Sequence, residues 1–75
     1  MKYKYIRFDD YSVKGQKTKR FMCMNRNHGS LLGEVKWLAG WRQYCFFPQS
    51  STVFSKGCME DINDFIAKLM AERAS

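Results

Sequence analysis

Hydrophobic and polar residues alternate in several short segments of the N-terminal two thirds of the chain. Within residues 3–8, Ile6 and Phe8 alternate with polar or charged neighbours, and this period of two predicts a β-strand. Three further segments rich in apolar and aromatic side chains predict strands of the same kind: residues 19–25, 31–37 and 41–47.

The C-terminal segment has a different period, because its apolar residues fall on one stripe of an α-helix. The stripe consists of Cys58, Met59, Ile62, Phe65, Ile66, Leu69 and Met70. Ser55 is expected to cap the helix N-terminus, and Asp64 and Lys68 have the spacing of an i,i+4 ion pair. The predicted fold is therefore α+β: a four-stranded antiparallel meander sheet with one C-terminal helix packed on one face, forming a single small domain over residues 1–75.

The turn between the last two predicted strands decides which of their side chains share a face. A two-residue turn would place Ala39 at positive φ, which alanine disfavours, so we predict a three-residue turn, 38–40, with Gly40 in the left-handed conformation. This register sets Trp37 opposite Trp41. It predicts a core face of Leu31, Val35, Trp37, Trp41, Cys45 and Phe47. It leaves on the open face Leu32, Glu34, Lys36, Arg42, Tyr44 and Phe46. A slip of one residue would exchange the two faces.

Charge is distributed unevenly along the chain. The formal net charge is +6, with ten Lys or Arg against three Asp or Glu in residues 1–54 and three against four in residues 55–75. A basic body of this kind favours an acidic partner, either nucleic acid or an acidic protein surface. Solubility alone is the simpler explanation of the same charge.

The cysteines and the N-terminus predict a cytoplasmic protein, or one of the host cell cytoplasm if it is viral. Three cysteines make a poor disulfide framework, which favours a reducing compartment. The first ten residues carry charges where a signal peptide would be apolar, and no apolar run is long enough for a membrane span. We therefore expect no membrane partner.

Two sets of residues are candidates for binding nucleic acid. The first is a basic loop that could contact successive phosphates: Lys14, Lys17, Lys19 and Arg20. The second is the predicted open face, where cations alternate with rings on which bases could stack: Lys36, Arg42, Tyr44 and Phe46. The alternatives are a solvated connection for the loop, and a second buried layer or a homodimer interface for the face.

Metal binding and catalysis have weaker support in the sequence. A zinc site would need Cys23, His28, Cys45 and Cys58, but these residues lack the close pairs typical of zinc modules. His28 is the only histidine and has no evident orienting partner, so no catalytic residue is assigned. We expect a protein without enzymatic activity, metal or cofactor.

A long C-terminal segment resembles a group of small proteins from phages, prophages and other mobile elements. The similarity follows the pattern L-G-x-[IV]-K-W, three residues, W-R-x-Y-C-F-F-P, a linker, and C-[LM]-x-D-I-x-x-F-I, from Leu32 to Ile66. The resemblance implies an accessory protein of viral or mobile-element origin and assigns no functional residue. Our leading hypothesis is a nucleic-acid-binding accessory protein. The alternative is a protein-binding module, such as an inhibitor of a host factor, that uses the open face for a partner or a second copy.

Overall fold

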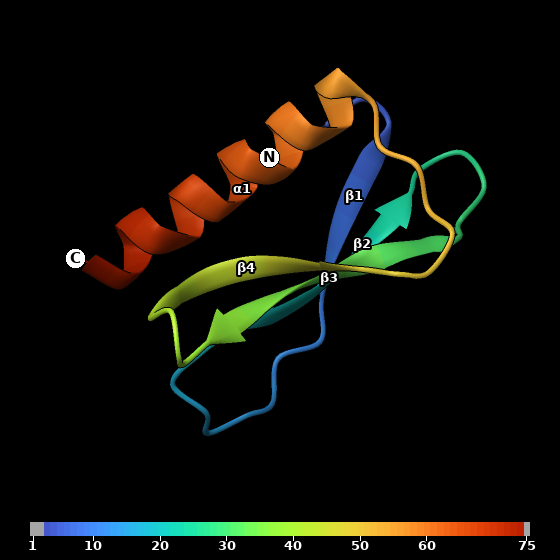
Figure 1. Ribbon diagram of the computed structural model, residues 1–75. Coiled ribbons are helices and arrows are strands. Elements are labelled where there is room, and N and C mark those ends of the chain that lie inside the picture. Colours follow the sequence, from blue (N-terminus) through green and yellow to red (C-terminus); the bar gives the residue numbers. More distant parts are fainter. Residues whose placement is uncertain (1–2, 75) are drawn as a thin grey trace.

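The computed structural model describes residues 3–74, which form one antiparallel sheet and one helix (Figure 1). The elements are β1 (Ile6–Asp10), β2 (Arg20–Asn25), β3 (Leu31–Leu38), β4 (Gln43–Pro48) and α1 (Lys56–Ala74). The strands lie in the order β1-β2-β3-β4, so each pairs with its neighbour in sequence. The helix α1 lies across one face of the sheet, and the predicted α+β meander is confirmed.

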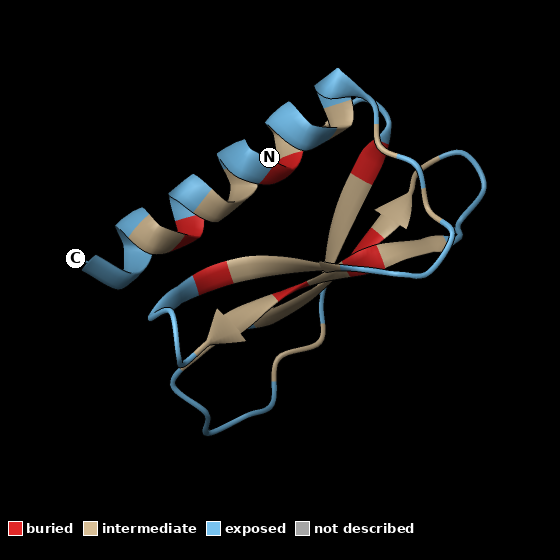
Figure 2. Cartoon of the chain, in the orientation of Figure 1, coloured by how far each residue is buried: buried red, intermediate tan, exposed pale blue. Residues whose placement is uncertain are grey.

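The core lies between α1 and the sheet, where buried residues of the two layers face each other (Figure 2). Its most buried apolar members are Ile6, Cys23, Val35, Tyr44, Ile62 and Leu69. Aromatic rings join the layers: Phe65 of α1 stacks on Phe8 with ring centroids 3.9 Å apart and meets Phe21 edge-on at 4.9 Å. Rings bury a large area per residue, which allows a chain of this length to form a core.

The helix begins as the sequence predicts. The Oγ of Ser55 accepts the N–H of Cys58 at 3.1 Å, which confirms Ser55 as the N-cap. The predicted ion pair between Lys68 and Asp64 is also present, at 2.9 Å. The buried stripe is narrower than predicted, since the Met59 side chain is 56% exposed.

The β3–β4 hairpin differs from the prediction. Trp37 pairs with Tyr44, and the turn has four residues between Leu38 and Gln43. The N–H groups of Trp41 and Arg42 both donate to the carbonyl of Leu38, at 3.1 and 2.8 Å, and Arg42 has φ 56°. Arg42 thus takes the left-handed position that the prediction gave to Gly40.

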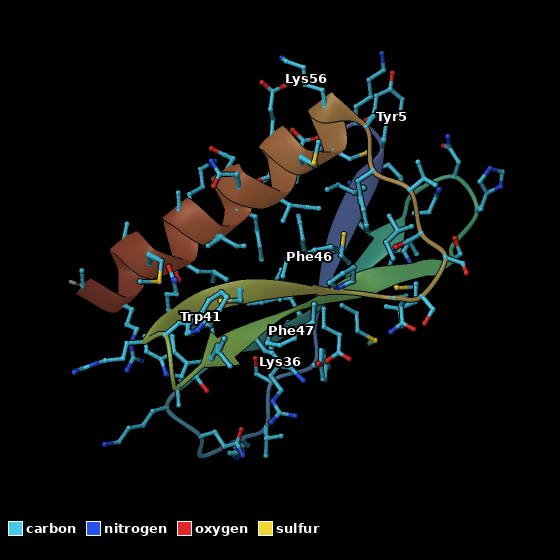
Figure 3. All side chains as sticks on the ribbon, viewed as in Figure 1. Tyr5, Lys36, Trp41, Phe46, Phe47 and Lys56 are labelled. Atoms are coloured by element: carbon cyan, nitrogen blue, oxygen red, sulfur yellow. The ribbon has the colours of Figure 1, made fainter. Side chains whose placement is uncertain are left out.

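The longer turn exchanges the two faces of β4. The predicted pairing of Trp37 with Trp41 is wrong, and Tyr44 and Phe46 pack against the core in place of Cys45 and Phe47. Gly33 provides the space for the Phe46 ring, because a Cβ on Gly33 would lie 2.5 Å from Phe46 Cζ. Figure 3 shows Phe46 between the sheet and α1, with Phe47 on the opposite side of the sheet.

Two smaller differences concern the N-terminal strands. The first strand begins at Ile6 and continues to Asp10, later than the predicted 3–8. The pairing of β2 with β3 shifts by one residue: Cys23 pairs with Gly33 but Met24 pairs with Leu31, so Leu32 of β3 has no partner in the register. Leu32 packs on the core instead of lying on the open face with Glu34.

Candidate functional site

The connection between β1 and β2, residues 11–19, holds the three lysines of the predicted basic loop, and we use that name for it from here on. It is closed at its base by hydrogen bonds around Ser12. The Arg20 N–H donates to Ser12 Oγ at 2.8 Å, and the Ser12 N–H donates to Asp10 Oδ1 at 2.8 Å. Hydrogen bonds from Ser12 hold the pKa of Asp10 below its ordinary value. These contacts fix the direction in which the loop leaves the sheet.

The far end of this loop is attached to the core and to the helix. The backbone N–H of Lys19 donates to the hydroxyl of Tyr44 at 3.0 Å, and the Tyr44 side chain is almost completely buried. The Lys19 ammonium group forms an ion pair with Glu72 of α1 at 3.3 Å. The loop, β4 and the C-terminal end of α1 therefore meet at one end of the molecule.

Two depressions lie at this end, and Arg73 lines both of them. One has a volume of about 330 Å³ and is lined by Lys17, Lys19, Tyr44, Leu69, Glu72 and Arg73. The other has a volume of about 300 Å³ and is lined by Trp37, Arg42, Met70, Arg73 and Ala74. We call this surface the basic end and define it by four cations: Lys17, Lys19, Arg42 and Arg73.

Two tryptophans accompany these cations. The guanidinium group of Arg73 lies 4.0 Å from the ring centroid of Trp37, within the range of a cation–π contact. Trp41, in the β3–β4 turn, leaves 68% of its surface exposed. The basic end thus combines cations with an exposed ring on a turn that backbone hydrogen bonds hold in place.

Comparison with known proteins identifies a relative of this chain. Over 69 residues, covering 92% of this chain and 88% of the relative, the sequence is 32% identical to a protein of Acholeplasma phage L2 described as an "Uncharacterized 9.3 kDa protein". The chain belongs to the family of this small phage protein. No protein-family model and no solved structure matches this chain.

The structure separates seven of the eight predicted binding residues of this phage-family protein into three places, and Lys14 lies apart from them. The basic end receives Lys17, Lys19 and Arg42, while Lys14 is exposed elsewhere in the basic loop. The open face of the sheet receives Arg20 and Lys36, which are paired across β2 and β3. The third place is the core, which takes Tyr44 and Phe46. The prediction that these two rings lie on the open face is wrong, because the four-residue turn reverses the faces of β4. Arg42, which was predicted on the same face, lies in the turn itself.

The open face of the sheet carries charges of both signs. Lys36 Nζ lies 4.7 Å from the ring centroid of Phe47 and 4.0 Å from Glu34 Oε2. The Tyr11 hydroxyl donates to Glu34, and burial together with this hydrogen bond raises the Tyr11 pKa. An ion pair between Arg7 and Asp9, at 3.1 Å, lies on β1. Two cations of this face, Lys36 and Arg7, therefore have carboxylate neighbours.

An apolar groove lies at the other end of α1. It has a volume of about 270 Å³ and is lined by Phe46, Pro48, Phe54, Met59, Ile62, Asn63 and Ile66. Val53, in the connection that leads to α1, is 90% exposed.

The cysteines do not converge with other metal-binding side chains. Cys23 is fully buried, and burial raises the pKa of its thiol to about 12, so the thiol is protonated at neutral pH. Among residues 3–74, no group of three or more His, Cys, Asp or Glu side chains could hold a metal ion. Nor does any helix in this range have the length and apolar character needed to cross a membrane.

Sequence reasoning missed three residues at or beside the basic end: Trp41, Glu72 and Arg73. Trp41 was assigned to the core by the wrong turn length, and a turn of four residues would have exposed it. Arg73 is a cation in the last turn of α1, where cations are common, and its position over Trp37 depends on how α1 crosses the sheet.

Proposed function

We propose that this phage-family protein is a non-catalytic accessory protein that binds nucleic acid through its basic end. The observation that carries the proposal is the convergence of four cations from three separate segments around two depressions that share Arg73. Phosphates attract such a cluster, and each phosphate neutralised releases counterions. Among the described residues that line the depressions, Glu72 carries the only carboxylate, and it is paired with Lys19.

The overall charge of the protein and the ion pairs on the open face also favour the basic end as the binding surface. The formal net charge of +6 attracts a polyanion from a distance. On the open face, by contrast, Glu34 lies beside Lys36 and Asp9 beside Arg7. Local neutralisation weakens phosphate contacts there, so the basic end is the favoured site.

The test is nucleic-acid binding measured as a function of salt. We expect affinity for a mixed-sequence DNA or RNA to fall steeply between about 50 and 200 mM salt, as counterion release requires. A double variant, Lys17→Glu with Arg42→Glu, should abolish most binding while circular dichroism shows an unchanged fold. Both side chains are exposed, so the exchange disturbs no core contact.

A control variant with the same change of charge is Lys4→Glu with Lys56→Glu. These lysines are exposed, and Lys56 lies at the opposite end of α1 from Arg73 (Figure 3). We expect this control to lose less affinity than the basic-end variant. Equal losses would indicate attraction by net charge alone. A stable dimer by light scattering, without salt-dependent binding, would favour the protein-binding alternative.

A further inference from the structure

Trp41 is a large apolar side chain that the fold leaves outside the core. It is 68% exposed, although tryptophan is usually well buried in proteins. Its neighbour Arg42 has φ 56°, a conformation that non-glycine residues rarely adopt. The backbone of the turn is fixed by two hydrogen bonds to Leu38, so the ring is presented from a defined position.

The other tryptophan shows what a structural ring looks like in the same hairpin. Trp37 meets the Tyr44 ring edge-on, with centroids 5.3 Å apart, and carries the Arg73 guanidinium group 4.0 Å above it. Tyr44 and Arg73, the two residues that contact the Trp37 ring here, belong to this chain. Trp41 lies beside Arg42, which lines a depression of about 300 Å³ together with Trp37 and Arg73.

We propose that the basic end selects single-stranded nucleic acid and that Trp41 stacks on an unpaired base. This inference rests on the proposed function and specifies its substrate class. A single strand offers both of the groups that this surface can hold: phosphates for the cations and an open base face for the ring. In a duplex the bases are already stacked, so an exposed indole gains little, and the cations alone would bind the duplex at least as tightly as the single strand, because its phosphates are more densely spaced.

The experiment compares two labelled probes by fluorescence anisotropy at low salt. One is a single-stranded oligothymidylate of about thirty nucleotides, and the other is the duplex of the same length formed with oligoadenylate, which is long enough to stay paired at low salt. The proteins are wild type, Trp41→Ala, Trp41→Phe and Tyr5→Ala. Tyr5 is the matched control because its ring is 50% exposed and lies 5.3 Å from the ammonium group of Lys4, away from the basic end (Figure 3).

We expect wild type to bind the single strand more tightly than the duplex. The Trp41→Ala change should weaken single-strand binding by about ten- to a hundredfold and leave duplex binding nearly unchanged. Trp41→Phe should retain most of the affinity, and Tyr5→Ala should retain all of it. Tryptophan emission should be quenched by the single strand in wild type and much less in Trp41→Phe, whose remaining tryptophan is covered by Arg73.

Different failures point to different conclusions. Equal affinity of wild type for both probes, with no loss in Trp41→Ala, would overturn the single-strand inference and leave the proposed function standing. A loss in Tyr5→Ala as large as that in Trp41→Ala would also overturn it, because the effect would not be specific to the site. No binding of either probe at low salt would overturn both proposals.

Discussion

The hydroxyl of Tyr44 accepts a hydrogen bond from the backbone N–H of Lys19 at 3.0 Å, which connects the buried face of β4 to the basic loop. The two residues are 25 positions apart in sequence, so this contact closes a large part of the chain. It also holds the backbone of Lys19, whose ammonium group forms an ion pair with Glu72. We therefore expect stability and the proposed nucleic-acid binding to be linked at this position.

Replacing Tyr44 with Phe should lower both the stability of the fold and the affinity for nucleic acid, while an aromatic ring still fills the same place in the core. The lost hydrogen bond should reduce the free energy of unfolding by about 0.5–1.5 kcal/mol, measured by urea denaturation. Nucleic-acid affinity should fall several-fold because the loop is less well ordered. Tyr3→Phe is the control, since it removes a hydroxyl that contacts Asp64 of α1, outside the basic loop. If Tyr3→Phe weakened binding as much, the loop anchor would not be the cause.

Gly33 should not tolerate a side chain. A Cβ at this position would lie 2.5 Å from Phe46 Cζ and 2.7 Å from the Phe47 carbonyl oxygen, and the latter is backbone that cannot move freely. We expect Gly33→Ala to lower the free energy of unfolding by about 1–3 kcal/mol through overpacking. Gly57→Ala in α1 should have the opposite sign, because its Cβ would meet only Ser55 Oγ at 3.9 Å and alanine favours the helix. A neutral Gly33→Ala would contradict the packing described for Phe46.

Glu72 should oppose nucleic-acid binding. Its carboxylate forms an ion pair with Lys19 at 3.3 Å and lines the same depression, so a phosphate must displace or approach it. Glu72→Gln should therefore raise the affinity several-fold and make it more dependent on salt. Glu60→Gln provides the control, because Glu60 pairs with Lys56 at the other end of α1. Weaker binding by the Glu72→Gln variant would show that the basic end is not the site.

The contact between Tyr3 and Asp64 should make stability depend on pH at both extremes. The Tyr3 hydroxyl donates to Asp64 Oδ2 at 2.8 Å. Burial, and then this hydrogen bond, raises the Tyr3 pKa, while hydrogen bonds from Lys68 and Tyr3 lower the Asp64 pKa. A raised pKa stabilises the fold below the ordinary tyrosine value of about 10, and this contribution is lost as pH rises through the folded value. A lowered pKa stabilises the fold above the ordinary aspartate value of about 3.9, and this contribution is lost as pH falls through the folded value.

Urea denaturation across pH tests this relationship with two variants. Tyr3→Phe should reduce the loss of stability above about pH 10, and Asp64→Asn should reduce the loss below about pH 4. The Tyr3→Phe curve should approach that of wild type at high pH, and the Asp64→Asn curve should approach it at low pH. If stability fell below about pH 4 as steeply in Asp64→Asn as in wild type, that result would contradict the lowered pKa of Asp64.

The sequence by itself determined the elements of this protein. Alternation within β1 to β4 and the apolar stripe of α1 are local patterns, and Ser55 caps the helix through neighbours three residues away. Such signals need no knowledge of distant contacts. They were enough for the α+β meander, and charge counting was enough to predict a basic surface.

Only the tertiary structure decided which residues form the candidate site. One extra residue in the turn after Leu38 exchanges the faces of β4, because side chains alternate with a period of two. The contact of Phe46 with Gly33 and the position of Arg73 over Trp37 depend on packing between segments that are distant in sequence. No local pattern records those contacts, so Tyr44 and Phe46 were placed outside and Trp41 inside. The basic end exists because the path of α1 brings Arg73 beside a loop that begins more than fifty residues earlier.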